Sequence, residues 1–180
     1  VYASSPDRGL ERLLRWWPGV VTKCPDAMLH IFYGRNNMRA FAAMGANGMT
    51  EFADKIEAMI EAAPNVIDHG LVPHPELHAH LAEAQVLAYP TGFEEVNCLT
   101  IQKAMAAGCL PVWSVAGCLP EVVEPVCDPF WEHSDSLDSP EAKAMFQKVM
   151  YVALNGYARY AKRESMPTWP DAAARWKEIL

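Results

Sequence analysis

The chain has 180 residues, of which 51% are hydrophobic and 21% are charged. This length favours one domain, and the hydrophobic fraction is too high for an intrinsically disordered chain. The formal net charge is -7, and lysine and arginine are scattered along the chain, so we expect no binding to nucleic acid.

Short apolar runs alternate with longer segments of helical periodicity from the first residue onward. The predicted strands are Val1–Ser4, Met28–Tyr33, Asn65–Asp68, Val86–Tyr89 and Leu110–Trp113. The predicted helices are Leu10–Trp17, Thr50–Ala62, Glu76–Ala84, Asn97–Ala107 and Leu119–Val123. This alternation predicts an α/β fold, a doubly wound, Rossmann-like parallel sheet that binds its ligand at the carboxyl ends of the strands.

The last quarter of the chain differs in composition. Cys127–Pro140 is rich in aspartate, serine and proline and is predicted to be a loop. Two helices are predicted after it, Pro140–Tyr160 and Pro170–Leu180. We therefore expect one domain over residues 1–180, with additional helices at its C-terminal end.

Cysteine usage and the start of the chain bear on its location. The five cysteines include no C-x-x-C pair, so neither a disulfide framework nor a zinc ribbon is predicted. No signal peptide is visible, and no apolar stretch reaches the roughly 18 residues of a membrane span. A cytoplasmic location fits best. Because the first residue is Val1 and already belongs to a predicted strand, we expect a fragment of a longer protein.

One turn has the features of an anion site. A predicted strand ends at Tyr89-Pro90, the turn Thr91–Glu95 follows, and Val96–Leu99 are expected in the first turn of the next helix. Free backbone N–H groups and the positive end of the helix dipole suit a diphosphate. Such turns occur in any α/β protein, so geometry alone does not assign a ligand.

The residues of this region add to the argument. Its motifs are, in order, Pro90-Thr91, Glu95, Ala104-Met105-Ala106-Ala107-Gly108, Pro111-Val112 and Gly117-Cys118-Leu119-Pro120-Glu121. They resemble the donor-binding C-terminal domain of the retaining GT-B glycosyltransferases of the group that includes glycosyltransferase family four. His69-Gly70-Leu71-Val72 resembles the family's loop at the nucleotide base, and Ser5–Leu10 its basic turn at the donor phosphates. The resemblance covers roughly Val1–Val123, and Trp169–Leu180 is similar to the family's C-terminal helix.

The resemblance implies roles for individual residues. Glu95 is expected to face the sugar hydroxyls or the positive charge that develops at the anomeric carbon, and Arg8 to hold the diphosphate; both are expected to be catalytic. The simpler alternatives are a carboxylate that complements a helix dipole and a solvated arginine. The residues expected to bind the donor are Gly70, Leu71, Thr91, Val96, Asn97, Cys98, Leu99 and Lys103.

Two positions depart from the family pattern. Family members often carry a basic residue about five positions before the equivalent of Arg8, where this chain has Ala3. The second glutamate of the family's pair, which the resemblance assigns to the ribose hydroxyls, is Lys103. A carboxylate accepts hydrogen bonds whereas an ammonium group only donates them, so the donor is held differently here or the site is weakened.

The histidines raise the question of a metal. His74, His78 and His80 lie close in sequence, and the first two have the i, i+4 spacing of a helical pair. Pro75, however, predicts that His74 precedes the helix, and no carboxylate or thiolate completes a ligand set at a known spacing. No metal and no cofactor are therefore expected.

The expected activity follows from the resemblance. The full-length protein is expected to be a hexosyltransferase-like enzyme that transfers a sugar, with retention, from a nucleotide-sugar to a carbohydrate or lipid-linked acceptor. The acceptor would bind to an N-terminal domain that this chain lacks, so the chain alone is expected to be nearly inactive. Two alternatives stay open: a non-catalytic nucleotide-binding or interaction module with a degenerate GT-B site, which Lys103 permits, and a nucleotide-sugar epimerase. The pattern makes no prediction about association with a membrane surface.

Overall fold

Parallel strands form the centre of the molecule in the computed structural model. The structure describes residues 1–46, 48–123, 128, 130 and 136–160, and for residues 157–160 it describes the backbone alone. Strand β1 (Leu29–Phe32) pairs with β2 (Val66–Gly70), and β3 (Val86–Tyr89) pairs with β4 (Leu110–Trp113), each in parallel.

The N-terminal residues connect these two pairs of strands. The Tyr2 amide donates to the carbonyl of His30, and the Tyr2 carbonyl accepts from the Phe32 amide, both at 2.9 Å. On the other side, the Val1 carbonyl accepts from the Ala88 amide at 2.9 Å. The order across the sheet is therefore β2, β1, Val1–Tyr2, β3, β4.

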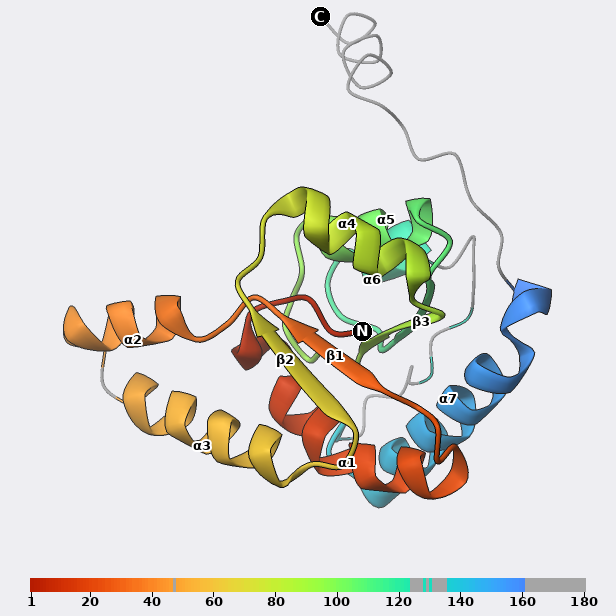
Figure 1. Ribbon diagram of the computed structural model, residues 1–180, viewed down its shortest axis with the longest axis horizontal. Coiled ribbons are helices and arrows are strands. Elements are labelled where there is room, and N and C mark those ends of the chain that lie inside the picture. The colour runs from red at the N-terminus through yellow and green to blue at the C-terminus, as the bar shows by residue number, and fades with distance from the viewer. Residues whose placement is uncertain (47, 124–127, 129, 131–135, 161–180) are drawn as a thin grey trace, which may run out of the picture.

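Helices cover both faces of the strands (Figure 1). On one face lie α4 (His74–Glu83), α5 (Leu99–Ala106) and α6 (Leu119–Val123), and on the other α1 (Leu10–Lys23), α3 (Met49–Ala62) and α7 (Pro140–Tyr160). A short 3-10 helix, η1 (Pro6–Arg8), precedes α1, and α2 (Asn36–Ala43) precedes α3. The predicted doubly wound α/β fold is confirmed. Within the described ranges, no helix is both long enough and apolar enough to span a membrane.

Large aromatic side chains fill the layer between the strands, α1 and α7. Trp16 and Trp17 of α1 are each 2% exposed, and Phe146 of α7 is fully buried. The ring centroids of Trp16 and Phe146 are 5.3 Å apart. Burying side chains of this size contributes about 1.5–3 kcal/mol each, so this layer holds the strand ends in fixed positions.

Two helices differ from the sequence prediction in extent. The predicted Leu10–Trp17 continues through Pro18 to Lys23 as α1, because Trp16, Trp17 and Val20 on both sides of the proline are buried. That burial outweighs the loss of one hydrogen bond at a proline. Helix α2 was not predicted, since Met38 is its one buried residue and it has no apolar stripe.

Two further predictions concern helix starts, and both are wrong. Helix α4 begins at His74, whereas Pro75 was expected to place His74 before the helix. Pro75 occupies the second helical position, where an N–H would have no partner in the helix. Helix α5 begins at Leu99 after Cys98, so Val96 and Asn97 belong to the preceding turn and not to the helix. The predicted helix Pro170–Leu180 lies outside the described residues, as does most of the predicted loop Cys127–Pro140.

Candidate functional site

Two adjoining cavities open at the carboxyl ends of the strands. The first, of about 240 Å³ and here called the Arg8 cavity, is lined by Ala3, Ser4, Ser5, Arg8, Tyr33, Glu95, Asn97, Cys98, Leu99 and Thr100. The second, of about 200 Å³ and here called the Lys103 cavity, is lined by Ala3, Phe32, Tyr33, Leu71, Val72, His74, Leu77, Leu81, Thr100 and Lys103. The residues common to both are Ala3, Tyr33 and Thr100, so the cavities are neighbours.

A buried carboxylate and a half-buried guanidinium group meet in the Arg8 cavity. Glu95 is 5% exposed, and both of its oxygens accept from Arg8 Nη1 at 3.2 Å. The Tyr89 hydroxyl donates a short hydrogen bond to Glu95 Oε1. Burial raises the pKa of Tyr89, and the neighbouring Cys98 and Glu95 raise it further, so the phenol stays protonated as the donor.

Arg8 has N–H donors that do not take part in its contact with Glu95. Its guanidinium carbon lies 4.1 Å from the centroid of the Phe93 ring, which fixes the side chain from one side. Its Nε is buried and has no hydrogen-bond partner among the described residues. A guanidinium group carries five N–H donors, so Arg8 can bind an anion in the cavity without losing Glu95.

The loop before α6 holds the turn that carries Glu95. The Cys118 amide donates to the Glu95 carbonyl at 2.7 Å, and the Gly117 amide donates to Glu94 Oε2 at 3.1 Å. Gly117 has a φ of 54°, and a Cβ at this residue would lie 2.2 Å from the Glu95 carbonyl oxygen. Only glycine fits this approach, so the Gly117 loop fixes the position of Glu95.

The N-terminus of α5 faces the same cavity. No side chain caps α5, and its N-cap residue is Cys98. Burial raises the pKa of the Cys98 thiol to about 11, so Cys98 is a neutral thiol and not a nucleophilic thiolate at neutral pH. The amides at this terminus carry a partial positive charge, which adds to that of Arg8.

Lys103 and Ala3 lie on the wall of the Lys103 cavity. The Thr100 hydroxyl donates to the Ala3 carbonyl at 2.9 Å and ties α5 to the N-terminal segment. Lys103 is one turn further along α5 and borders the same cavity as Ala3.

Tyr33 is a further candidate site residue, which the sequence analysis did not name as one. It follows β1, lines both cavities and has a φ of 101°, which is rare for a residue other than glycine. Its amide donates to the Gly70 carbonyl at 2.8 Å, which maintains this conformation. Backbone strain of this kind occurs mainly at functional sites. The one sequence feature that could have indicated Tyr33 is its position beside Gly34 directly after a strand, where a ligand-binding turn is common in α/β folds.

The predicted catalytic and donor-binding residues fall into three groups. Arg8, Glu95, Asn97, Cys98 and Leu99 line the Arg8 cavity, while Leu71 and Lys103 line the Lys103 cavity. Gly70, Thr91 and Val96 line neither cavity. Thr91 is fully buried and accepts a hydrogen bond from Ser114 through its carbonyl, and Val96 is 90% exposed.

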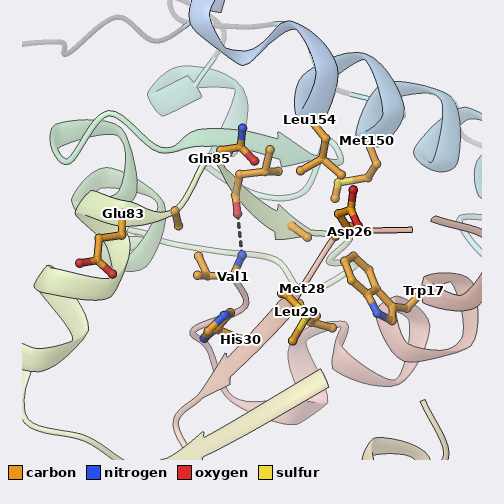
Figure 2. A pocket seen from close by; sticks show the side chains of 14 residues that line it. Val1, Trp17, Asp26, Met28, Leu29, His30, Glu83, Gln85, Met150 and Leu154 are labelled. Atoms are coloured by element: carbon orange, nitrogen blue, oxygen red, sulfur yellow. Dashed lines mark hydrogen bonds between the residues drawn. The ribbon is translucent and has the colours of Figure 1, made fainter. Parts of the chain in front are cut away.

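A larger cavity lies at the opposite, amino end of the strands (Figure 2). It has about 290 Å³ and is bordered by Val1, Trp17, Asp26, His30, Glu83 and Met150 among others. Its lining includes two carboxylates, Asp26 and Glu83, and neither arginine nor lysine, so it suits an anionic ligand less well than the Arg8 cavity does.

Among known proteins, similarity to this chain is found in a solved structure and not in sequence. No protein-family model matches the sequence, and no curated protein matches it. Among solved structures, the chain is similar to AviGT4, a glycosyltransferase involved in avilamycin A biosynthesis, with a TM-score of 0.54 and 16% sequence identity. The match covers 99% of this chain and 48% of AviGT4, so the chain spans about half the length of that structure. The likeness shows a fold shared with a glycosyltransferase.

Proposed function

We propose that this chain is the nucleotide-sugar-binding domain of a retaining GT-B glycosyltransferase, and that the diphosphate of the donor binds in the Arg8 cavity. The supporting observation is that the Arg8 guanidinium group and the uncapped N-terminus of α5 face one cavity at the carboxyl edge of the strands. Both carry positive charge where a leaving diphosphate gains negative charge.

The roles of the other groups follow from their positions. Glu95, held by Arg8 and Tyr89, accepts hydrogen bonds from the sugar or stabilises the cationic anomeric carbon. Arg8 and the α5 amides stabilise the diphosphate as the glycosidic bond breaks. The nucleoside extends into the Lys103 cavity past Tyr33, which lines both cavities.

The size of the cavities supports a site shared with a second domain. Each is smaller than the roughly 300–1,000 Å³ of typical small-molecule sites. The chain matches 48% of AviGT4, which leaves length for a second domain in a longer protein; in this proposal such a domain would close the site and bring the carbohydrate or lipid-linked acceptor. In this proposal no metal is needed for the donor.

One observation favours the alternative of a non-catalytic nucleotide-binding module. Lys103 replaces the carboxylate that the family resemblance assigns to the ribose, and it lines the cavity where the ribose would bind. A module of this kind would bind nucleotides but would transfer no sugar after joining to its N-terminal domain.

Calorimetric titration of the full chain with UDP, GDP and ADP in EDTA tests the proposal. We expect weak binding of at least one of them, because one side of a cleft supplies the donor contacts without closure. No heat of binding and no spectral change with any of the three at millimolar concentration would contradict the donor site.

Lys103→Ala is expected to weaken nucleoside diphosphate binding more than nucleoside binding and to reduce its salt dependence. In this proposal the Lys103 ammonium group reaches past Ala3, which borders both cavities, to a phosphate oxygen in the Arg8 cavity, and such a contact is screened by salt. The measurement is affinity at two salt concentrations, with Lys148→Ala on the exposed face of α7 as the matched control. If Lys103→Glu tightens the binding of both nucleoside and diphosphate, the lysine has no phosphate role and the site is a weakened donor site.

Tyr33→Gly is expected to weaken nucleoside diphosphate binding while leaving the free energy of unfolding within about 1 kcal/mol of the unchanged chain. Glycine relieves the strain of the 101° φ, about 1–3 kcal/mol, and this offsets the lost side-chain contacts. Loss of a base–aromatic stack costs about 1–3 kcal/mol of binding. Tyr33→Phe should bind as the unchanged chain does, and pyrophosphate affinity should be the same in all three. A Tyr33→Gly chain with full nucleotide affinity would remove Tyr33 from the site.

A further inference from the structure

Three histidines that are distant in sequence meet on the face of the sheet beneath α4. His30 comes from β1, His69 from β2 and His80 from α4. One nitrogen of each lies within 4.8 Å of a nitrogen of the other two, and His30 Nδ1 and His69 Nε2 are 2.9 Å apart. We propose that His30, His69 and His80 bind one divalent transition-metal ion, with Zn²⁺ as the best chemical match.

The spacing of the nitrogens is close to that of a zinc site. Two nitrogens bound to one tetrahedral zinc ion at about 2.0–2.1 Å lie about 3.3 Å apart. His30 and His69 need to separate by a few tenths of an ångström, and the His80 nitrogen, which lies within 4.8 Å of both, needs to move in by up to about 1.5 Å. All three side chains are half-buried, so the ion reaches them from solvent and water can occupy the fourth position.

The surroundings already orient the rings. Ile31 pairs with Asp68 and Phe32 pairs with Gly70, so the register of β1 and β2 shifts at His69. Phe32 stacks on His69 with ring centroids 4.5 Å apart and an angle of 9°, and it lies 5.0 Å from His80. A bulge that re-aims one side chain, with a buried ring that fixes it, reduces the entropy lost on binding an ion.

The charges near the cluster favour a cation. Burial lowers the pKa of His30 and of His69, and the neighbouring histidines lower both further. Glu83 lies near His30, and Glu76 and Asp68 lie near His69, although Asp68 is also paired with Arg35 at 2.6 Å. The Val1 ammonium group, which also acts on His30, opposes them. Imidazole nitrogen suits zinc, copper and nickel, and not magnesium or calcium.

This metal site is separate from the proposed donor site and was not predicted, since the sequence analysis expected no metal. None of the three histidines lines the Arg8 cavity or the Lys103 cavity. A bound ion would join α4 to β1 and β2. Leu77 and Leu81 of α4 form part of the wall of the Lys103 cavity, so the ion would also stabilise that wall.

The pair His74 and His78, whose spacing the sequence analysis considered and rejected as a metal site, gives the matched control. His74 and His78 are exposed on α4, their rings stack 6.1 Å apart, and they belong to one helix. Within the described ranges, His30, His69 and His80 form the one group of three that could hold an ion. His78→Gln therefore removes a histidine from the same helix but outside the cluster.

The experiment is titration of the EDTA-treated and dialysed full chain with Zn²⁺, and with Co²⁺ as a spectroscopic probe. We expect one ion per chain, visible absorption of tetrahedral Co²⁺, and a higher melting temperature with Zn²⁺ but not with Mg²⁺. Loss of a group that merely supports a ligand weakens metal binding about 10–100-fold, so His69→Gln and His80→Gln should weaken it at least about tenfold. His78→Gln should bind as the unchanged chain does.

Three outcomes would overturn the site: no binding of Zn²⁺ at micromolar concentration, equal binding by His69→Gln and His80→Gln, or loss of binding in His78→Gln. A thiolate-to-Co²⁺ charge-transfer band would assign the ion to a half-exposed cysteine such as Cys24 or Cys118 instead. Each variant is first compared with the unchanged chain by melting temperature without metal. If His69→Gln does not fold, His80→Gln on α4 provides the same test.

Discussion

Gly117→Ala is expected to lower the free energy of unfolding by about 2–5 kcal/mol. A residue other than glycine in the left-handed region costs about 1–2 kcal/mol, and Gly117 has a φ of 54°. The added Cβ would also lie 2.2 Å from the Glu95 carbonyl oxygen and 2.4 Å from the Glu95 amide nitrogen. Because both are backbone atoms, the turn has to move, at a further cost of about 1–3 kcal/mol.

Urea denaturation measures this effect, and Gly45→Ala is its matched control. Gly45 has a φ of 94° with nothing within 4 Å of its added Cβ, so this variant carries the conformational cost without the clash. Gly117→Ala should also lose nucleotide affinity, since the displaced turn leads into Asn97, Cys98 and the N-terminus of α5, which line the Arg8 cavity, whereas Gly45→Ala should retain it. Equal losses of stability in the two variants would show that the Gly117 loop does not press on the Glu95 turn.

Arg8→Ala is expected to weaken nucleoside diphosphate binding by about 1.5–3 kcal/mol, the contribution of a hydrogen bond to a charged group. The control is Arg15→Ala, which also removes one positive charge. Arg15 belongs to α1 and lines neither site cavity, so this variant should bind the diphosphate with unchanged affinity. Calorimetry with the same diphosphate measures both variants. A circular dichroism melt of Arg8→Ala is needed beside it, because the change leaves Glu95 buried without its cation.

The partner of Arg8 distinguishes a phosphate clamp from an ion pair that only supports the fold. Glu95→Gln keeps the shape of the side chain but removes the charge that competes with phosphate for Arg8. If Arg8 binds phosphate, Glu95→Gln should bind the diphosphate at least as tightly as the unchanged chain. Should Arg8→Ala and Glu95→Gln weaken binding equally, the pair acts through the fold alone.

The sequence predicted the elements whose side chains are buried in a regular pattern. Val86–Tyr89 and Leu110–Trp113 are strands with the predicted bounds, because every residue in them is buried and apolar runs of this length are typical of central parallel strands. The helix Asn36–Ala43 escaped prediction since Met38 is its one buried residue. The periodicity of apolar residues predicts a helix only where one face of that helix is buried, and Asn36–Ala43 has no such face.

The candidate site was predictable where it depends on local motifs and not where it depends on pairing between distant segments. The turn at Glu95 and the basic residue Arg8 follow from short motifs, and the structure brings these side chains to 3.2 Å. Tyr33 required its backbone conformation to be known, and the histidine cluster required the register of β1 on β2. A local sequence pattern predicts neither the φ of Tyr33 nor the register between two strands that are distant in sequence.

The most direct test of the donor site is the location of amide chemical-shift changes when the ¹⁵N-labelled chain is titrated with UDP, GDP or ADP in EDTA. The proposal predicts that the changes concentrate at Ser5–Gly9, Tyr33, Leu71 and Glu95–Lys103, which surround the Arg8 and Lys103 cavities. Changes that concentrate instead at Asp26–His30 and Glu83–Val86, around the cavity at the amino ends of the strands, would contradict it.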